Sequence, residues 1–68
     1  MTNSQRMDRA KALVQRLQAA GQTPDNISEA LESRVSPRTI YRWSRGETAP
    51  QNRSNVLALE RLVATVGA

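Results

Sequence analysis

The arginines of one short segment carry the most distinctive chemistry in this sequence. In VSPRTIYRWSRGETAP, residues 35–50, Arg38, Arg42 and Arg45 stand four and three positions apart. A helix would place them in one stripe within roughly 60°, opposite the apolar Ile40. Like charges at this spacing destabilise a helix by about 0.2–0.5 kcal/mol per pair. The stripe therefore indicates an anionic partner, with a solvated basic face as the alternative.

The positive charge is concentrated in the middle of the chain. The formal net charge is +4, and residues 34–53 contain five arginines but only one acid, Glu47. Residues 23–33 instead hold three acids and no base, which we interpret as a solvated helix face. Arginine suits bidentate contact with both phosphate and guanine. Nucleic acid is the class of partner that this pattern favours.

The composition excludes several other kinds of chemistry. The 68-residue chain has no cysteine and no histidine, so it has no thiol nucleophile, no disulfide and no ordinary zinc site. It also lacks a phosphate-binding glycine loop. No apolar run approaches the 18 residues that a membrane span needs. We therefore expect a cytoplasmic, non-enzymatic protein without cofactor or metal, forming a single domain over residues 1–68.

Four segments have the apolar period of a helix, and none alternates with the period of two that is typical of strands. The first segment is expected to begin at Asn3 or Ser4 as N-cap and to end at Gly21. The second follows the N-cap Thr23 and starts with Pro24. Their predicted inward-facing residues are Ala10, Leu13, Val14, Leu17, Ala20, Ile27, Ala30 and Leu31.

The third and fourth segments have similar boundary signals. Ser36 is the predicted N-cap of a helix that Gly46 ends. The last helix is expected to run from about residue 53 to 66, with Asn52 or Ser54 as its cap. The residues predicted to be buried on these two helices are Ile40, Trp43, Val56, Leu59, Leu62, Val63 and Val66. The sequence thus predicts an all-α fold, a compact bundle of four or five short helices.

Two short helices joined by a brief connection, the second with an outward basic stripe, have the layout of a helix-turn-helix. The residues that carry this pattern are ISEAL, then VSPRTIYRWSRGE, then Pro50 with NVLALERLV. Over roughly residues 7–66 the sequence resembles the Cro and phage-repressor domains, often called the xenobiotic-response-element family. The resemblance implies a lambda-repressor-like fold with the helix-turn-helix at about residues 23–46.

The chain departs from that family in the turn between the two helices. Family members usually have a short turn that contains glycine, whereas residues 31–36 read LESRVS, two residues longer and without glycine. An ungapped match would place Glu29 at a buried apolar position, which is costly without a partner. We therefore expect a longer turn, which leaves the crossing angle of the two helices open.

The resemblance also implies which residues would contact DNA. The family's base-reading positions fall here on Pro37, Arg38, Thr39, Tyr41 and Arg42. Each of the two arginines can hold guanine O6 and N7, and Pro37 can contact a thymine methyl. The rim of the same surface is expected to contact phosphates through Thr23, Arg34, Ser36, Arg45 and Arg53. For Arg34 and Arg53, a solvated surface arginine remains an equal alternative.

The function that these features favour is sequence-specific binding of double-stranded DNA by a small transcriptional regulator. We expect a repressor of phage, prophage or mobile-element type that binds an inverted-repeat operator as a homodimer. Leu57 and Ala64, on the outward flank of the last helix, are the predicted dimer contacts. Two alternatives remain open. One is a helix-turn-helix-shaped module that binds a protein, such as an antitoxin-like or anti-repressor partner, and the other is a non-specific nucleic-acid binder.

Overall fold

The computed structural model describes residues 2–67, apart from the side chain of Asn3. It contains α1 (Asn3–Ala19), α2 (Pro24–Ala30), α3 (Pro37–Arg45) and α4 (Arg53–Val66). Within the described residues there is no strand and no fifth helix. The predicted all-α bundle is therefore confirmed with four helices, the longest of which is α1 with 17 residues.

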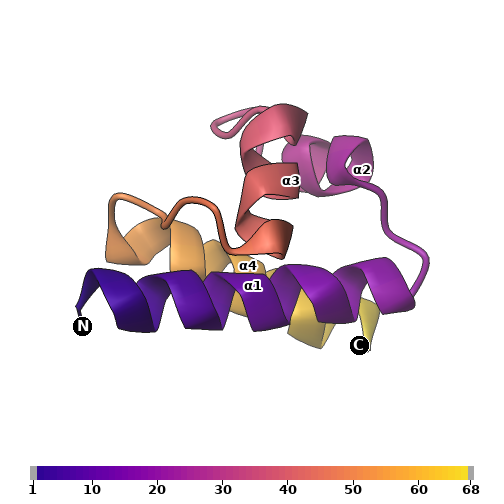
Figure 1. The fold of residues 1–68 in the computed structure, drawn as a ribbon. Helices are drawn as coiled ribbons and strands as arrows, with labels where there is room; N and C mark the ends of the chain where they lie inside the picture. Colours follow the sequence, from indigo (N-terminus) through magenta and orange to yellow (C-terminus); the bar gives the residue numbers. More distant parts are fainter. Residues whose placement is uncertain (1, 68) are drawn as a thin grey trace.

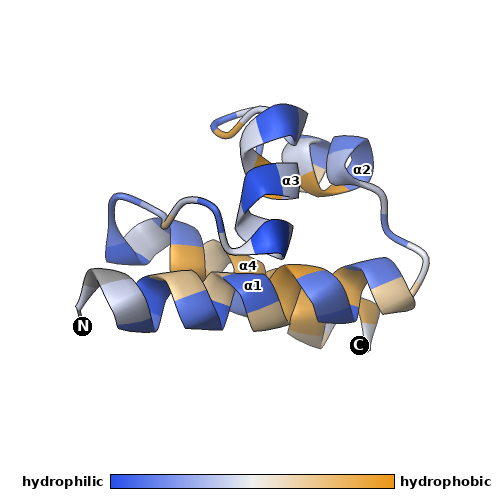
Figure 2. Ribbon diagram, viewed as in Figure 1, coloured by the Kyte–Doolittle hydropathy of each residue, from blue (hydrophilic) through white to orange (hydrophobic). Residues whose placement is uncertain are grey.

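The helices form two pairs that cross each other (Figure 1). α1 packs against α4 along the base of the molecule, while α3 rises steeply across α1 and carries α2 beside it. The whole measures 27 × 20 × 19 Å. α3 is thus supported from behind by both α1 and α2, and its outer turns are hydrophilic (Figure 2).

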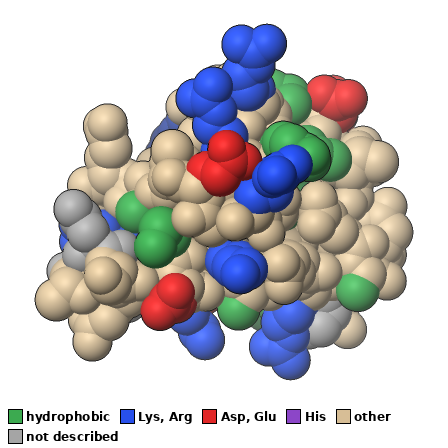
Figure 3. Space-filling view, in the orientation of Figure 1, with side chains coloured by type: hydrophobic (Ala, Val, Ile, Leu, Met, Phe, Trp, Pro, Cys, Tyr) green, Lys and Arg blue, Asp and Glu red, His purple; other side chains and the backbone are tan. Residues whose placement is uncertain are grey.

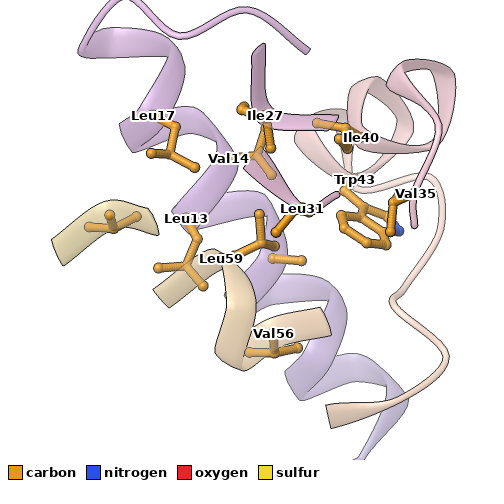
Figure 4. Packing of buried hydrophobic residues seen from close by; sticks show 12 residues of the cluster. Leu13, Val14, Leu17, Ile27, Leu31, Val35, Ile40, Trp43, Val56 and Leu59 are labelled. Carbon is orange, nitrogen blue, oxygen red and sulfur yellow. The ribbon is translucent and has the colours of Figure 1, made fainter. Parts of the chain in front are cut away.

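A single apolar core receives side chains from all four helices and from the turn before α3. Figure 4 shows the side chains of α1 and α4 meeting those of α2 and α3 between the two pairs of helices. Trp43 is only 2% exposed, which confirms its expected place in the core. The buried apolar residues are Ala10, Leu13, Val14, Leu17, Ile27, Leu31, Val35, Ile40, Trp43, Val56, Leu59 and Val63.

Three residues predicted to be buried are exposed instead. Ala20, Ala30 and Val66 all lie at the carboxyl ends of helices, where the neighbouring elements no longer cover the apolar face. Leu62 is half-buried and packs against the edge of the core. On α2 the buried residue that the prediction did not include is Ser28, next to Ile27.

The start of α1 also differs from the prediction. Its N-cap is Thr2, not Asn3 or Ser4, because Thr2 forms a capping box with Gln5. The Gln5 backbone N–H donates to Thr2 Oγ1 at 3.2 Å, and the Thr2 N–H donates to Gln5 Oε1 at 2.9 Å. The other three caps are confirmed, since the side chains of Thr23, Ser36 and Asn52 each accept a backbone N–H of the helix that follows.

The turn between α2 and α3 is long and free of glycine, as expected, and it has an unusual backbone. Glu32 and Ser33 both adopt left-handed conformations, with φ of 58° and 61°. The Ser33 N–H donates to Ser28 O and the Glu32 N–H donates to Glu29 O, both at 2.9 Å, which is the pattern of a Schellman motif. Ser28 Oγ also donates to Val35 O at 2.7 Å, so the buried serine ties α2 to the residue preceding the cap of α3.

None of the four described helices combines the length and the apolar character that crossing a bilayer requires. The apolar faces of the helices meet each other in the core instead.

Candidate nucleic-acid interface

α3 is positioned by contacts on its inner face, which leaves its outer face accessible. Ile40, Trp43 and Ser44 are buried against the rest of the molecule. Gln15 Nε2 on α1 donates to Ser44 O at 2.9 Å, which fixes the carboxyl end of α3 against α1. The helix ends at Gly46, whose φ of 72° favours glycine. The orientation of the outer residues is therefore set by the core.

The five residues predicted to contact bases lie together on this one helix. Arg38, Tyr41 and Arg42 are exposed, while Pro37 and Thr39 are half-buried. The Thr39 hydroxyl lies 3.0 Å from Ser36 Oγ, so it already has a hydrogen-bond partner at the start of the helix. The two arginines are consequently the most available hydrogen-bond donors of this group.

Arg38 and Arg42 stand one helical turn apart, and neither has a partner within the described part of the chain. Neither side chain forms an ion pair, a hydrogen bond or a ring contact there. Adjacent like charges are unfavourable on an isolated helix. The fold holds both guanidinium groups at the surface with all of their donors available to a ligand.

Arg45, the third arginine of the stripe, is in a different situation. Its Nη1 donates to the Tyr41 hydroxyl at 3.0 Å, and its guanidinium carbon lies 5.6 Å from the centre of the Tyr41 ring. Its Nε lies 3.1 Å from Glu47 Oε2. The hydrogen bond with Tyr41, and then the negative charge of Glu47, raise the pKa of Arg45 above its usual value. Sequence reasoning missed this cluster, although the four-residue spacing of Tyr41 and Arg45 was a signal for it.

The remaining predicted phosphate contacts are at the surface but are dispersed. Thr23 and Ser36 cap α2 and α3, and Arg53 is the first residue of α4. Arg34 lies in the turn before α3, where its Nη2 is 3.5 Å from Glu32 Oε2. Both of those side chains are mostly exposed, so this pair contributes little to stability. Of the four, Arg34 and Ser36 share a hollow with Arg42, whereas Thr23 and Arg53 do not line it.

That hollow, of about 570 Å³, opens between α3 and the start of α4. Its charged lining residues are Arg34 and Arg42, and the other polar groups are hydroxyls and amides, with no carboxylate among them. The indole of Trp43 forms part of the wall. Sequence reasoning missed the hollow because it depends on how α3 and α4 are placed relative to each other, which no local pattern encodes.

Basic side chains project from the part of the surface formed by α3 and its neighbours, with carboxylates between some of them (Figure 3). The three acids of α2 and the following turn, Asp25, Glu29 and Glu32, are exposed, as expected of a solvated face. Among the described residues, no group of three or more acidic or other metal-binding side chains could hold a metal ion.

The predicted dimer contacts lie on the outer side of α4. Leu57 is 40% exposed, and Ala64 is also exposed two turns further along the same helix. Exposure of a single leucine is ordinary in a monomer. Both side chains are placed where a second copy could contact them.

The chain was compared with protein-family models, with curated proteins and with solved structures. None of the three comparisons finds a match. The functional interpretation therefore depends on the chemistry and geometry of the α3 surface.

Proposed function

We propose that the protein is a sequence-specific regulator that inserts α3 into the major groove of double-stranded DNA. The observation that carries this proposal is the pair Arg38 and Arg42, exposed one turn apart and without partners in the described chain. The opposite face of the same helix is fixed in the core by Ile40 and Trp43. A rigid helix with two available guanidinium groups has the form that direct reading of bases requires.

The chemistry of the groove explains why arginine would serve this purpose. Guanine presents two acceptors, O6 and N7, in the major groove, and a bidentate arginine contact discriminates against other bases by about 1–3 kcal/mol. The groove is wide enough to admit an α-helix. The flanking phosphates would offset the repulsion between Arg38 and Arg42, with Arg34, Arg45 and Arg53 as additional cations.

One recognition helix contacts few base pairs, so the proposal includes a homodimer on an inverted-repeat operator. Two α3 helices would then occupy half-sites about one helical turn apart. Leu57 and Ala64 on α4 would contribute to the dimer contact. The biological role that fits these properties is a small cytoplasmic repressor of phage, prophage or mobile-element type, which excludes other proteins from its operator.

The direct test is selection of duplexes from a random library, followed by titration of the selected and a scrambled duplex at several salt concentrations. We expect an inverted repeat that binds at least ~10³-fold more tightly than the scrambled duplex. If no motif emerges and affinity falls with salt equally for every duplex, the arginines form a non-specific patch. If no duplex binds, the protein-binding alternative replaces this proposal.

A further inference from the structure

The indole N–H of Trp43 has no hydrogen-bond partner in the described chain, although its nitrogen is not fully inaccessible. The side chain is 2% exposed, and its N–H donates to no described residue. No described side-chain nitrogen or oxygen is both fully inaccessible and without a partner. The indole nitrogen must therefore be reached from an open side. Figure 4 shows it at the end of the ring near Val35, and both residues line the hollow between α3 and α4.

The charges around that hollow determine which acceptor suits this donor. Arg34 and Arg42 lie in its wall, and no carboxylate does, although Glu32 Oε2 lies 3.5 Å from Arg34 Nη2 outside the hollow. The opposite wall includes Asn52, the N-cap of α4, so the positive end of the α4 dipole lies at the same place. The hollow is therefore lined by a nearly buried donor, two cations and a helix N-terminus. An oxyanion is the acceptor that satisfies all of them.

We propose that the hollow is a binding site for a phosphate group. The Trp43 N–H and the Arg42 guanidinium donate to its oxygens, and Arg34 adds a second positive charge. The volume of about 570 Å³ is within the range of small-molecule sites, so the hollow accommodates a phosphate ester as well as the bare ion. The phosphate can belong to a small metabolite or to a nucleic-acid backbone. In the function proposed above Arg42 contacts a base, so a phosphate in the hollow competes with that contact for the same guanidinium.

The single tryptophan makes a direct experiment possible. In ¹⁵N-labelled protein, the indole N–H of Trp43 gives the only signal of its kind, since the chain has one tryptophan. We expect inorganic phosphate to move this signal in a saturable way at pH 7.5, while chloride at matched ionic strength does not. An indole signal that does not respond to phosphate, or that responds equally to chloride, would overturn the proposal.

Two charge-neutralising variants and one matched control test the assignment. Arg42→Gln should weaken the phosphate response about tenfold, the effect of losing one charge-assisted hydrogen bond. Arg34→Gln should weaken it less. Arg61→Gln removes the same charge from α4 outside this hollow and should leave the response unchanged. An equal loss in all three variants would mean diffuse attraction and would overturn the site. Dispersion of the other backbone signals shows whether each variant remains folded.

Adding duplex DNA separates the two sources of phosphate. If the duplex moves the indole signal and competes with phosphate, a backbone phosphate fills the hollow. If phosphate moves the signal but a bound duplex does not, the site takes a free phosphate ester. If phosphate acts and no duplex binds, the site stands while the DNA-binding function fails. If neither ligand moves the signal, the site is refuted.

Discussion

Two arginines of α1 make contacts within the protein, whereas two arginines of α3 make none with the described residues. Arg6 Nε donates to Pro50 O at 3.1 Å, and Arg9 pairs with Glu60 at 2.9 Å. These contacts attach α1 to the segment after α3 and to α4. Arg38 and Arg42 are exposed and have no partner in the described chain. Arg6 and Arg9 therefore serve the fold, whereas Arg38 and Arg42 make no contact with it.

The number of basic residues on a helix is therefore a weaker guide to a ligand-binding surface than the contacts that those residues make within the protein. Arg45 belongs to the same stripe as Arg38 and Arg42, yet Tyr41 and Glu47 already hold it. Arg38 and Arg42 lie on the amino-terminal two turns of α3, and Arg42 lines the hollow at the start of α4. We expect substitutions of the α3 arginines to change DNA binding and substitutions of the α1 arginines to change stability.

The largest expected effect is on DNA binding, from Arg38→Ala and Arg42→Ala. Each change should weaken binding to the selected duplex by about 1–3 kcal/mol, because one bidentate base contact is lost. The free energy of unfolding should not fall and should rise by at most about 0.5 kcal/mol, because neither side chain contacts the described fold and the repulsion between them is relieved. Fluorescence anisotropy and urea denaturation measure the two quantities. An Arg38→Ala protein that binds the selected duplex normally would remove that residue from the readout.

A substitution that disturbs the placement of α3 without altering its charge should instead lower the free energy of unfolding. Ser28→Ala removes the donor to Val35 O and leaves a carbonyl in the core without that hydrogen bond. We expect a loss of about 1–3 kcal/mol in the free energy of unfolding, the cost of an unsatisfied buried acceptor. Urea denaturation is the measurement. Ser4→Ala, at an exposed position, is the control and should change stability by less than about 0.5 kcal/mol.

A substitution in the turn before α3 should make the protein more stable. Glu32→Gly relieves the left-handed backbone of Glu32, and we expect the free energy of unfolding to rise by about 0.5–1 kcal/mol. Glu32→Ala is the matched control, because it removes the same carboxylate but keeps a Cβ. A gain from alanine equal to that from glycine would assign the effect to charge and not to backbone conformation. Thermal denaturation compares the two variants.

The smallest expected effect comes from Arg9, which pairs with Glu60 within the protein. Arg9→Ala should lower the free energy of unfolding by about 0.2–1 kcal/mol at low salt, the usual value of a surface ion pair. A double-mutant cycle with Glu60→Gln isolates the contribution of the pair. The ratio of affinities for selected and scrambled DNA should not change. A reduced ratio in Arg9→Ala would contradict the division between the two regions.

Local signals predicted most of this fold. The apolar period placed the four helices, the caps Thr23 and Ser36 were read directly, and Asn52 was one of the two candidates for the cap of α4. The period also placed Trp43 in the core and the predicted base-contacting residues on one helix. Such features depend on a few neighbouring residues, and the backbone rules that govern them are the same in every helix.

Most of the wrong or missing predictions concern features that depend on how the helices are placed relative to one another. Ala20, Ala30 and Val66 fit the apolar period, but the helices that would cover them do not extend that far. The cap of α1 was misplaced by one or two residues because the pairing of Thr2 with Gln5 was overlooked, although both residues were visible in the sequence. The hollow beside Trp43 needed the position of α4 relative to α3, so no sequence pattern could indicate it.

The central claim is that α3 reads DNA sequence while the other basic surface does not. The most direct test compares two double variants that remove equal charge, Arg38→Gln with Arg42→Gln on α3, and Arg9→Gln with Arg16→Gln on α1. Arg16 lies two turns after Arg9 on the same flank of α1, away from the side where Gln15 contacts α3.

Affinities for the selected and the scrambled duplex are measured for both proteins at one salt concentration. We predict that the α3 variant binds the two duplexes equally, while the α1 variant keeps the preference of the unmodified protein. Equal loss of preference in both proteins, or a preserved preference in the α3 variant, would contradict the claim.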